Sequence, residues 1–134
     1  MAETGSVSTP AAPAAVGPYV QARWAGELLF LSGQIGLEPA TGELVSGGAA
    51  DQARQAMQNL GAVLQAAGLG WEQVVKCTIY LTDMAHFQEV NRVYASFFPE
   101  GGPLPARACV AVAALPRGAA VEIEAVARRE GSRL

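Results

Sequence analysis

The chain has 134 residues, of which 51% are hydrophobic and 16% charged, and its formal net charge at pH 7 is −3. This length fits one domain, and the charged fraction lies below the roughly 25% typical of soluble domains. The low charged fraction indicates that another subunit covers part of the surface, and the acidic balance disfavours a dedicated nucleic-acid-binding protein.

The histidine and cysteine counts narrow the chemistry further. The chain contains one histidine, His86, and two cysteines, Cys77 and Cys109, without a CxxC motif. These counts exclude a zinc site of the Cys₄ or Cys₂His₂ type within one chain, and we expect no metal and no cofactor. No apolar run of about 18 residues and no secretory signal are apparent, which, with two unpaired cysteines, predicts a cytoplasmic protein without a membrane span.

The first third of the chain predicts a hairpin. Residues 1–18 are rich in Ala, Pro, Ser and Thr, so composition alone predicts a flexible lead-in. Two strands are expected at 19–24 and 28–35, joined by a tight turn at 25–27. The apolar run Leu28 to Leu31 is typical of a strand buried on both faces.

The remaining periodicities predict two helices and three more strands. Apolar residues at i, i+3, i+4 and i+7 predict a first helix that ends at Gly68, with Gln52, Asn59 and other polar residues mostly off its apolar stripe. Thr82 or Asp83 is a candidate cap for the second helix. The predicted elements are a helix at 51–67, a strand at 74–81, a helix at 84–98, and strands at 107–112 and 121–128. The order β-β-α-β-α-β-β predicts one sheet with helices on one face, in an α+β or mixed α/β domain.

The last two strands carry most of the polar chemistry. If they pair in antiparallel fashion with their apolar faces toward the helices, then alternation places Arg107, Cys109, Glu122 and Glu124 together on the opposite face. Cross-strand neighbours lie about 5 Å apart, so these groups are expected to touch. A purely structural interpretation is that they form weak, solvent-exposed ion pairs. If another subunit covers that face, an arginine and a carboxylate are costly unless they are paired or used.

Three other polar residues have ordinary structural interpretations. Asn91 lies beside the apolar stripe of the second helix, where a partly buried amide can cap a neighbouring strand or loop. His86 points away from that stripe and is expected to be solvated and not catalytic. Cys77 falls in an apolar strand, which favours core packing over a reactive thiol.

The segment Pro105-Ala106-Arg107-Ala108-Cys109-Val110, followed by Val121-Glu122-Ile123, resembles the RidA family, also called YjgF. The similarity spans about residues 7–127 and includes Ser32-Gly33-Gln34-Ile35, Thr82-Asp83-Met84 and Gly17-Pro18-Tyr19-Val20-Gln21-Ala22. Val20 stands where the family usually has a serine.

The resemblance implies a fold and an assembly. The fold is a single mixed sheet with two helices on one face, chorismate-mutase-like, as one domain over 1–134 with flexible ends at 1–5 and 129–134. It also implies a first strand at Ser6 to Thr9 in place of a flexible lead-in. The family assembles as a homotrimer around a central barrel, with clefts between subunits, which would cover the polar face and account for the low charge content.

The resemblance also implies an activity, the hydrolysis of 2-imino acids such as 2-iminobutanoate and 2-iminopropanoate to 2-oxo acids and ammonia. Arg107 would hold the substrate carboxylate, and Glu122 would orient or deprotonate the attacking water and pass a proton to the leaving nitrogen. The pocket would be completed by the remaining predicted binding residues, Tyr19, Ser32, Gly33, Asn91 and Cys109. Asn91 would be a polar wall or a prop for Glu122. Cys109 is expected to line the pocket and not to act as a nucleophile, because no histidine is nearby to generate a thiolate.

Three alternatives stay open. The same arginine and cleft would serve a non-catalytic trimer that binds or senses small 2-oxo acids. Endoribonuclease activity has been described for some relatives, but the acidic charge and the lack of a basic stripe argue against it. Another imine or enamine, for example aminoacrylate, would use the same two residues.

Overall fold

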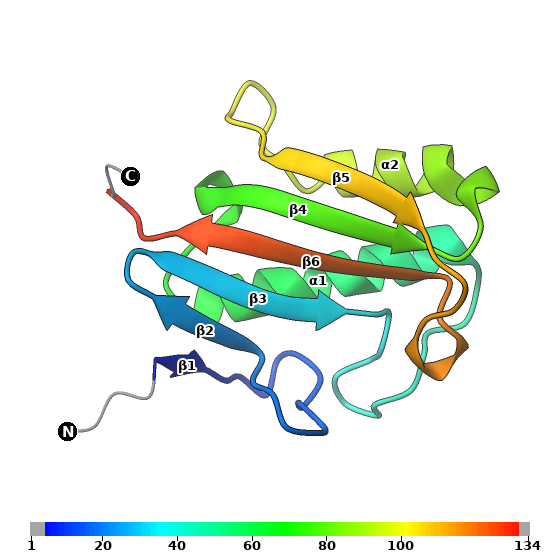
Figure 1. Cartoon of the computed structure of the whole chain (residues 1–134), viewed down its shortest axis with the longest axis horizontal. Coiled ribbons are helices and arrows are strands. Elements are labelled where there is room, and N and C mark those ends of the chain that lie inside the picture. Colours follow the sequence, from blue (N-terminus) through cyan, green and yellow to red (C-terminus); the bar gives the residue numbers. More distant parts are fainter. Residues whose placement is uncertain (1–4, 132–134) are drawn as a thin grey trace.

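A mixed six-stranded sheet organises the computed structural model, which describes residues 5–131. Two helices in these residues, α1 (Ala49–Ala66) and α2 (Phe87–Ala95), lie behind the sheet as seen in Figure 1 and cover one of its faces. The strands are β1 (Ser6–Val7), β2 (Ala22–Ala25), β3 (Leu28–Gln34), β4 (Val74–Leu81), β5 (Ala106–Ala111) and β6 (Val121–Arg128). Their spatial order is β1-β2-β3-β6-β4-β5, and only the β4–β5 pair is parallel. On the other face of the sheet, which we call the open face, no helix of residues 5–131 packs.

Most predicted elements are confirmed with small shifts at their ends. The first strand implied by the resemblance exists as β1, and the turn at Gly26 and Glu27 joins β2 to β3. The strand expected at 19–24 begins later, at Ala22. The second helix is shorter than expected, with a 3₁₀ turn at Met84–His86 before α2, which ends at Ala95. The Asp83 carboxylate caps that turn by accepting a hydrogen bond from the backbone N–H of Ala85 at 2.9 Å.

Helix α1 packs its predicted apolar stripe against the sheet. Met57, Leu60 and Val63 are fully buried, and Gly68 takes the left-handed conformation (φ 78°) that ends a helix at this position. Two of its polar residues are buried as well, contrary to the prediction. The Asn59 amide donates to the backbone carbonyls of Ile35 and Leu37, and the Gln52 side chain accepts from the N–H of Ala120 at 2.8 Å. These bonds satisfy backbone groups that buried loops leave unpaired.

The predicted pairing of the last two strands is wrong. β4 lies between β5 and β6, parallel to β5 and antiparallel to β6 (Figure 1). The central positions go to the strands with the most apolar helix-facing residues, since Ile79 in β4 and Val121 and Ile123 in β6 are almost completely buried. β5 offers mainly alanine on one side and arginine on the other, and it forms an edge of the sheet.

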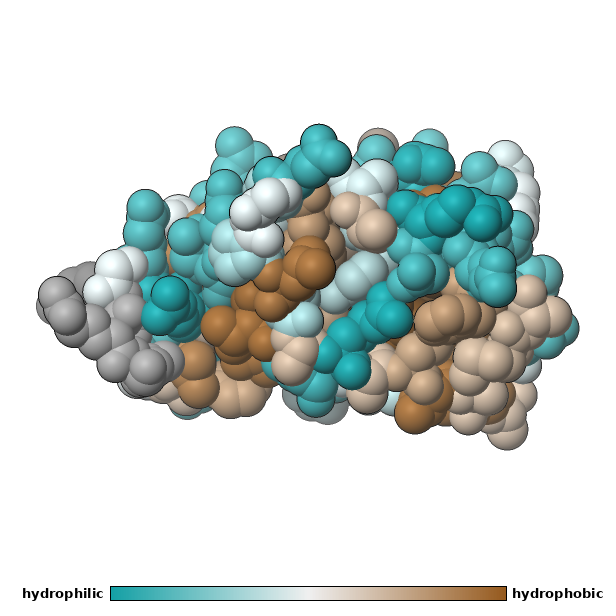
Figure 2. Space-filling model, turned by 90° about the horizontal axis from the view of Figure 1, so that it is seen from above, coloured by the Kyte–Doolittle hydropathy of each residue, from teal (hydrophilic) through white to brown (hydrophobic). Residues whose placement is uncertain are grey.

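The run Leu28 to Leu31 is buried on one face only, which corrects the expectation of a strand buried on both. Leu29 and Leu31 face the helices, whereas Phe30 points to the open face and is 49% exposed. Seen from above, hydrophilic side chains gather along one long side of the molecule, whereas apolar or small ones, interrupted by a hydrophilic band, gather along the other (Figure 2). An exposed aromatic ring on this face is an apolar surface that a second protein chain would cover.

The chain ends were expected to be flexible, and residues 1–4 and 132–134 lie outside the described residues. Arg129, which falls in the predicted tail, is held at the sheet by a 3.2 Å ion pair with Glu27 and by the ring of Trp24. Among residues 5–131, no helix has the length and apolar character that crossing a bilayer requires.

Candidate functional site

Arg107 is held against helix α2 by three side chains. Its Nη1 donates a hydrogen bond to Oδ1 of Asn91. Its guanidinium carbon lies 5.1 Å from the ring centre of Tyr94 and 5.6 Å from that of Phe87. These contacts fix the plane of the guanidinium while its remaining N–H donors stay available, because the residue as a whole is exposed.

The sequence builds this cradle through helical spacing and strand register. Phe87, Asn91 and Tyr94 follow i, i+4 and i+7 and therefore share one face of α2. Arg107 pairs in register with Cys77 of β4, which is buried under α2, so Arg107 emerges on the helix-covered side at the edge of the sheet. Asn91 therefore contacts Arg107 and does not prop Glu122 within one chain.

Glu122 lies on the opposite side of the sheet, against β3. A Cβ atom added at Gly33 would lie 2.1 Å from Oε2 of Glu122, so only glycine leaves room for the carboxylate there. Gly33 lies where the register between β3 and β6 shifts, and such irregularities expose backbone groups beside a site. Burial raises the pKa of the Glu122 carboxyl, and the neighbouring Glu124 carboxylate raises it further.

Two further predicted binding residues, Tyr19 and Ser32, lie beside Glu122. A groove of about 670 Å³ on the open face is lined by Tyr19, Ser32, Gly33 and Glu122 together with Arg117. Ser32 donates a 2.6 Å hydrogen bond to the backbone carbonyl of Val20, which joins the segment before β2 to β3. Tyr19 is 52% exposed, so its ring is free to cover a ligand in this groove.

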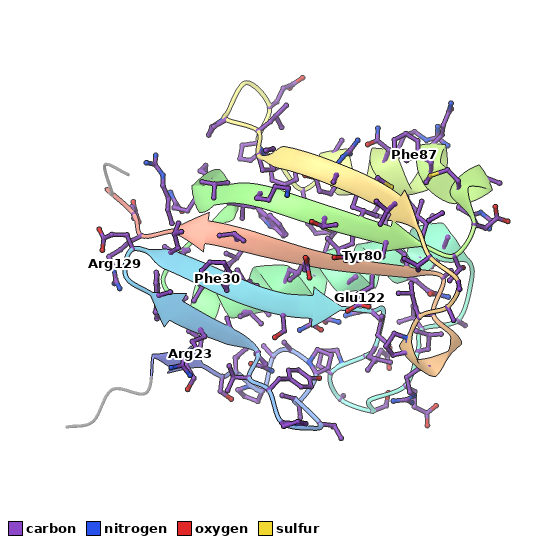
Figure 3. All side chains as sticks on the ribbon, in the orientation of Figure 1. Arg23, Phe30, Tyr80, Phe87, Glu122 and Arg129 are labelled. Atoms are coloured by element: carbon purple, nitrogen blue, oxygen red, sulfur yellow. The ribbon has the colours of Figure 1, made fainter. Side chains whose placement is uncertain are left out.

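The predicted single constellation is thus two half-sites on opposite faces of one sheet. Arg107, Asn91 and Cys109 form the first, which we call the arginine half-site, at the β5 edge. Glu122 with Tyr19, Ser32 and Gly33 forms the second, the glutamate half-site, on the open face. Figure 3 shows the separation: Glu122 lies beside Tyr80 on the face toward the viewer, whereas Phe87 belongs to α2 behind β5. Since β4 lies between their strands, the two half-sites of one chain cannot hold the same small ligand.

The histidine and the cysteines have the expected surroundings. His86 Nδ1 lies 2.8 Å from Oε1 of Glu89, at the surface and away from both half-sites. Cys77 is buried, and Cys109 is partly buried two residues beyond Arg107. Burial raises the pKa of the Cys109 thiol more than the Arg107 charge lowers it, which favours the unreactive thiol form. Within residues 5–131, no cluster of three or more His, Cys, Asp or Glu side chains is arranged to hold a metal ion.

Sequence reasoning missed three contributors to these half-sites. Phe87 and Tyr94 belong to the apolar stripe of the second helix, and the helical spacing that they share with Asn91 is the signal that groups them. Arg117 has a left-handed backbone (φ 62°) in the turn before β6, and its guanidinium donates to the carbonyl of Gly42 at 3.2 Å. A non-glycine residue in this conformation is uncommon, and its place beside Glu122 is not encoded in any local pattern.

Comparisons with known proteins agree with this fold. A family model described as endoribonuclease L-PSP matches residues 9–129. A mouse protein named 2-iminobutanoate/2-iminopropanoate deaminase is 52% identical over 121 residues, which cover 90% of this chain and 88% of that protein. The crystal structure of the E. coli YjgF gene product gives a TM-score of 0.87 at 44% identity, covering 93% of this chain and 98% of that one. E. coli TdcF, solved with bound serine, gives a TM-score of 0.88 at 43% identity with the same coverage of 93% and 98%.

Proposed function

Since this chain belongs to the RidA (YjgF) family, we propose that it is an imine/enamine deaminase that hydrolyses reactive 2-imino acids to 2-oxo acids and ammonia. The substrates would be 2-iminobutanoate and 2-iminopropanoate, the pair in the name of the mouse relative. The observation that carries the proposal is that one chain presents both an oriented, exposed Arg107 and a partly buried carboxylate, Glu122. Gly33 on the neighbouring strand has no side chain and so leaves room for that carboxylate.

The half-sites suit the two ends of such a substrate. The planar guanidinium of Arg107 would bind the substrate carboxylate through two parallel N–H donors, which fixes the imine carbon relative to the protein. Glu122 would accept a proton from water as the water oxygen bonds to the carbon of the protonated imine, which gives a neutral carbinolamine. Glu122 would then give this proton to the amino nitrogen, and as the C–N bond breaks and ammonia leaves, Glu122 would take the hydroxyl proton while the C=O bond of the 2-oxo acid forms. A carboxyl whose pKa is raised by burial is the better base for the first step.

The separation of the half-sites requires a second copy of the chain. We propose a homotrimer with a central barrel, in which the arginine half-site of one copy meets the glutamate half-site of its neighbour. Support comes from the apolar side chains exposed on the single chain, since Phe30 is 49%, Val110 41% and Tyr19 52% exposed. Burying them between copies would also remove water from the cleft where the imine binds.

The other predicted residues would shape this cleft. Tyr19 would close it with its ring, while Ser32 and the backbone of Gly33 would face the reacting end of the substrate. Asn91 would hold Arg107, and Cys109 would line the pocket as a neutral thiol. The working compartment would be the cytoplasm, where thiols such as Cys77 and Cys109 stay reduced.

The direct experiment measures ammonia released from imines that a threonine dehydratase generates in situ. Wild-type protein is expected to exceed spontaneous hydrolysis, and Glu122→Gln is expected to fall to that background while keeping its oligomeric mass. A wild-type rate equal to the background, together with binding of 2-oxobutanoate, would favour the non-catalytic binding trimer instead. The endoribonuclease activity in the family description is tested in parallel, and we expect an RNA substrate to stay intact because the net charge is −3.

A further inference from the structure

The open face carries a hydrogen-bonded pair beside Glu122 that the proposed reaction does not use. Tyr80 of β4 pairs in register with Glu122 of β6, so the two residues are direct cross-strand neighbours. The Tyr80 side chain reaches diagonally across to Glu124, two residues farther along β6, and its hydroxyl donates a hydrogen bond to Oε2 of Glu124 at 3.1 Å. Figure 3 shows Tyr80 and Glu122 side by side on this face.

Glu124 faces the same way as Glu122, because the two are separated by one residue in a strand. Their buried neighbours Val121, Ile123 and Ala125 alternate with them toward the helices. A spacing of two strand residues places like charges roughly 7 Å apart, where repulsion is felt unless water screens it fully. Both glutamates are only partly exposed, so screening is incomplete.

The positive groups on this face do not neutralise the pair directly. Arg23, Lys76 and Glu124 line a groove of about 870 Å³, and Arg117 lines the second groove, to which both Glu122 and Glu124 contribute. Within residues 5–131, none of these three cations approaches either carboxylate closely enough for an ion pair. Arg128 lies farther along β6, opposite Leu28 of β3. The titratable group that contacts Glu124 is therefore Tyr80, which stabilises its anion by donating a hydrogen bond.

We propose that Tyr80 and Glu124 are positioning residues for proton transfer by Glu122: the Tyr80 hydrogen bond holds the Glu124 carboxylate in place, and that carboxylate acts on Glu122 as a fixed neighbouring charge. This inference rests on the proposed imine hydrolysis, in which Glu122 must take a proton from water and then give it to nitrogen. A general base works best when its pKa approaches the working pH. A fixed neighbouring anion raises the pKa of a carboxyl without touching the substrate. The pKa of Tyr80 is raised by burial and by this same hydrogen bond, which keeps the phenol protonated and able to donate.

The test follows the Glu122 carboxyl carbon by NMR in protein labelled with ¹³C-glutamate, assigned through the Glu122→Gln variant. The same proteins give pH profiles of kcat/KM for imine hydrolysis. In Glu124→Gln, the Glu122 titration and the acidic limb of the profile are expected to move to lower pH. Glu100→Gln, which removes an exposed carboxylate in the loop after α2, is the control and should move neither.

Tyr80→Phe separates the role of the hydroxyl from that of the charge. Without this hydrogen bond the Glu124 carboxylate is no longer held beside Glu122, so the Glu122 titration should move in the same direction as in Glu124→Gln but less. Adding Tyr80→Phe to Glu124→Gln should change the Glu122 titration no further, since Tyr80 acts only through Glu124. A structural role of either residue would alter thermal stability or oligomeric mass but would not produce this pattern.

The outcomes keep the two claims apart. An unshifted Glu122 titration in folded Glu124→Gln, in a protein that hydrolyses imines, would overturn this inference alone. An independent further shift from Tyr80→Phe in the Glu124→Gln background would overturn the part assigned to Tyr80. Shifted titrations in a protein that does not hydrolyse imines would support the coupling of the carboxylates and overturn the proposed function.

Discussion

Replacing Arg107 by alanine separates the ligand-binding role of this side chain from its contribution to the fold. In the folded chain, the guanidinium makes two ring contacts and one hydrogen bond to a neutral amide. At an exposed site such contacts are worth about 0.5–1 kcal/mol each, so for three contacts we expect the free energy of unfolding to fall by about 1.5–3 kcal/mol. For a chain of this length the midpoint of thermal unfolding would fall by roughly 5–11 °C, which leaves the protein folded at assay temperature.

The expected effect on activity is larger. Losing the partner of a desolvated substrate carboxylate costs about 3–4 kcal/mol of transition-state binding, which is two to three orders of magnitude in kcat/KM. Ammonia release above the spontaneous rate, measured with imine generated in situ, gives this ratio. Arg107→Lys keeps the charge but loses the planar fork, so its kcat/KM should lie between those of the wild type and Arg107→Ala.

Arg92→Ala is the matched control, because Arg92 is an exposed arginine on the same helix that holds Arg107. It removes the same charge and should keep wild-type kcat/KM. If Arg107→Ala retains activity within about threefold of the wild type, the anchoring role is wrong. If it unfolds at assay temperature, the side chain serves mainly the fold.

Three further predictions concern other described residues. In Gly33→Ala, the new methyl group would collide with the Glu122 carboxylate, so kcat should fall more than about tenfold while the unfolding free energy changes by less than about 1 kcal/mol; an unchanged kcat contradicts the placement of Glu122. Because burial raises the pKa of Glu122, its ionised form destabilises the folded chain at pH values above that pKa. Glu122→Gln should therefore unfold at a higher temperature than the wild type at pH 8, and calorimetry should show the difference shrinking as the pH falls to about 4; a pH-independent difference contradicts this cause. Asn59→Ala leaves the carbonyls of Ile35 and Leu37 without their donor and should cost about 2 kcal/mol in urea unfolding, whereas an unchanged midpoint would show that water replaces the amide.

The sequence was most informative where the periodicity of one helix or strand determines which of its residues face the core. The apolar stripe of α1 predicted its buried face, and alternation in β6 correctly placed Glu122 and Glu124 opposite Val121 and Ile123. Both predictions depend only on the geometry of one element. The buried Asn59 was missed because its partners are backbone carbonyls in a loop that is distant in sequence.

The placement of Arg107 needed tertiary information. Alternation in β5 separates Arg107 and Cys109 from Ala108 and Val110, but it does not say which set faces the helices. Polarity favoured Ala108 and Val110 as the residues that face the helices. The strand lies at the sheet edge, however, where an arginine can reach both α2 and solvent. Strands adjacent in sequence pair roughly two-thirds of the time, and here the buried β4 takes the position between them. The wrong choice of helix-facing residues in β5 placed Arg107 on the same face as Glu122, and the wrong pairing made their strands neighbours.

The central claim, an active site shared between two copies of the chain, is tested most directly by mixing two inactive variants. Arg107→Ala and Glu122→Gln chains are denatured, combined in equal amounts and refolded, and imine hydrolysis is compared with each variant refolded alone. If every site takes Arg107 from one copy and Glu122 from its neighbour, about a quarter of the sites in randomly assembled trimers carry both residues and recover activity. Recovery near that fraction is the predicted result, and a mixture as inactive as its components would contradict it.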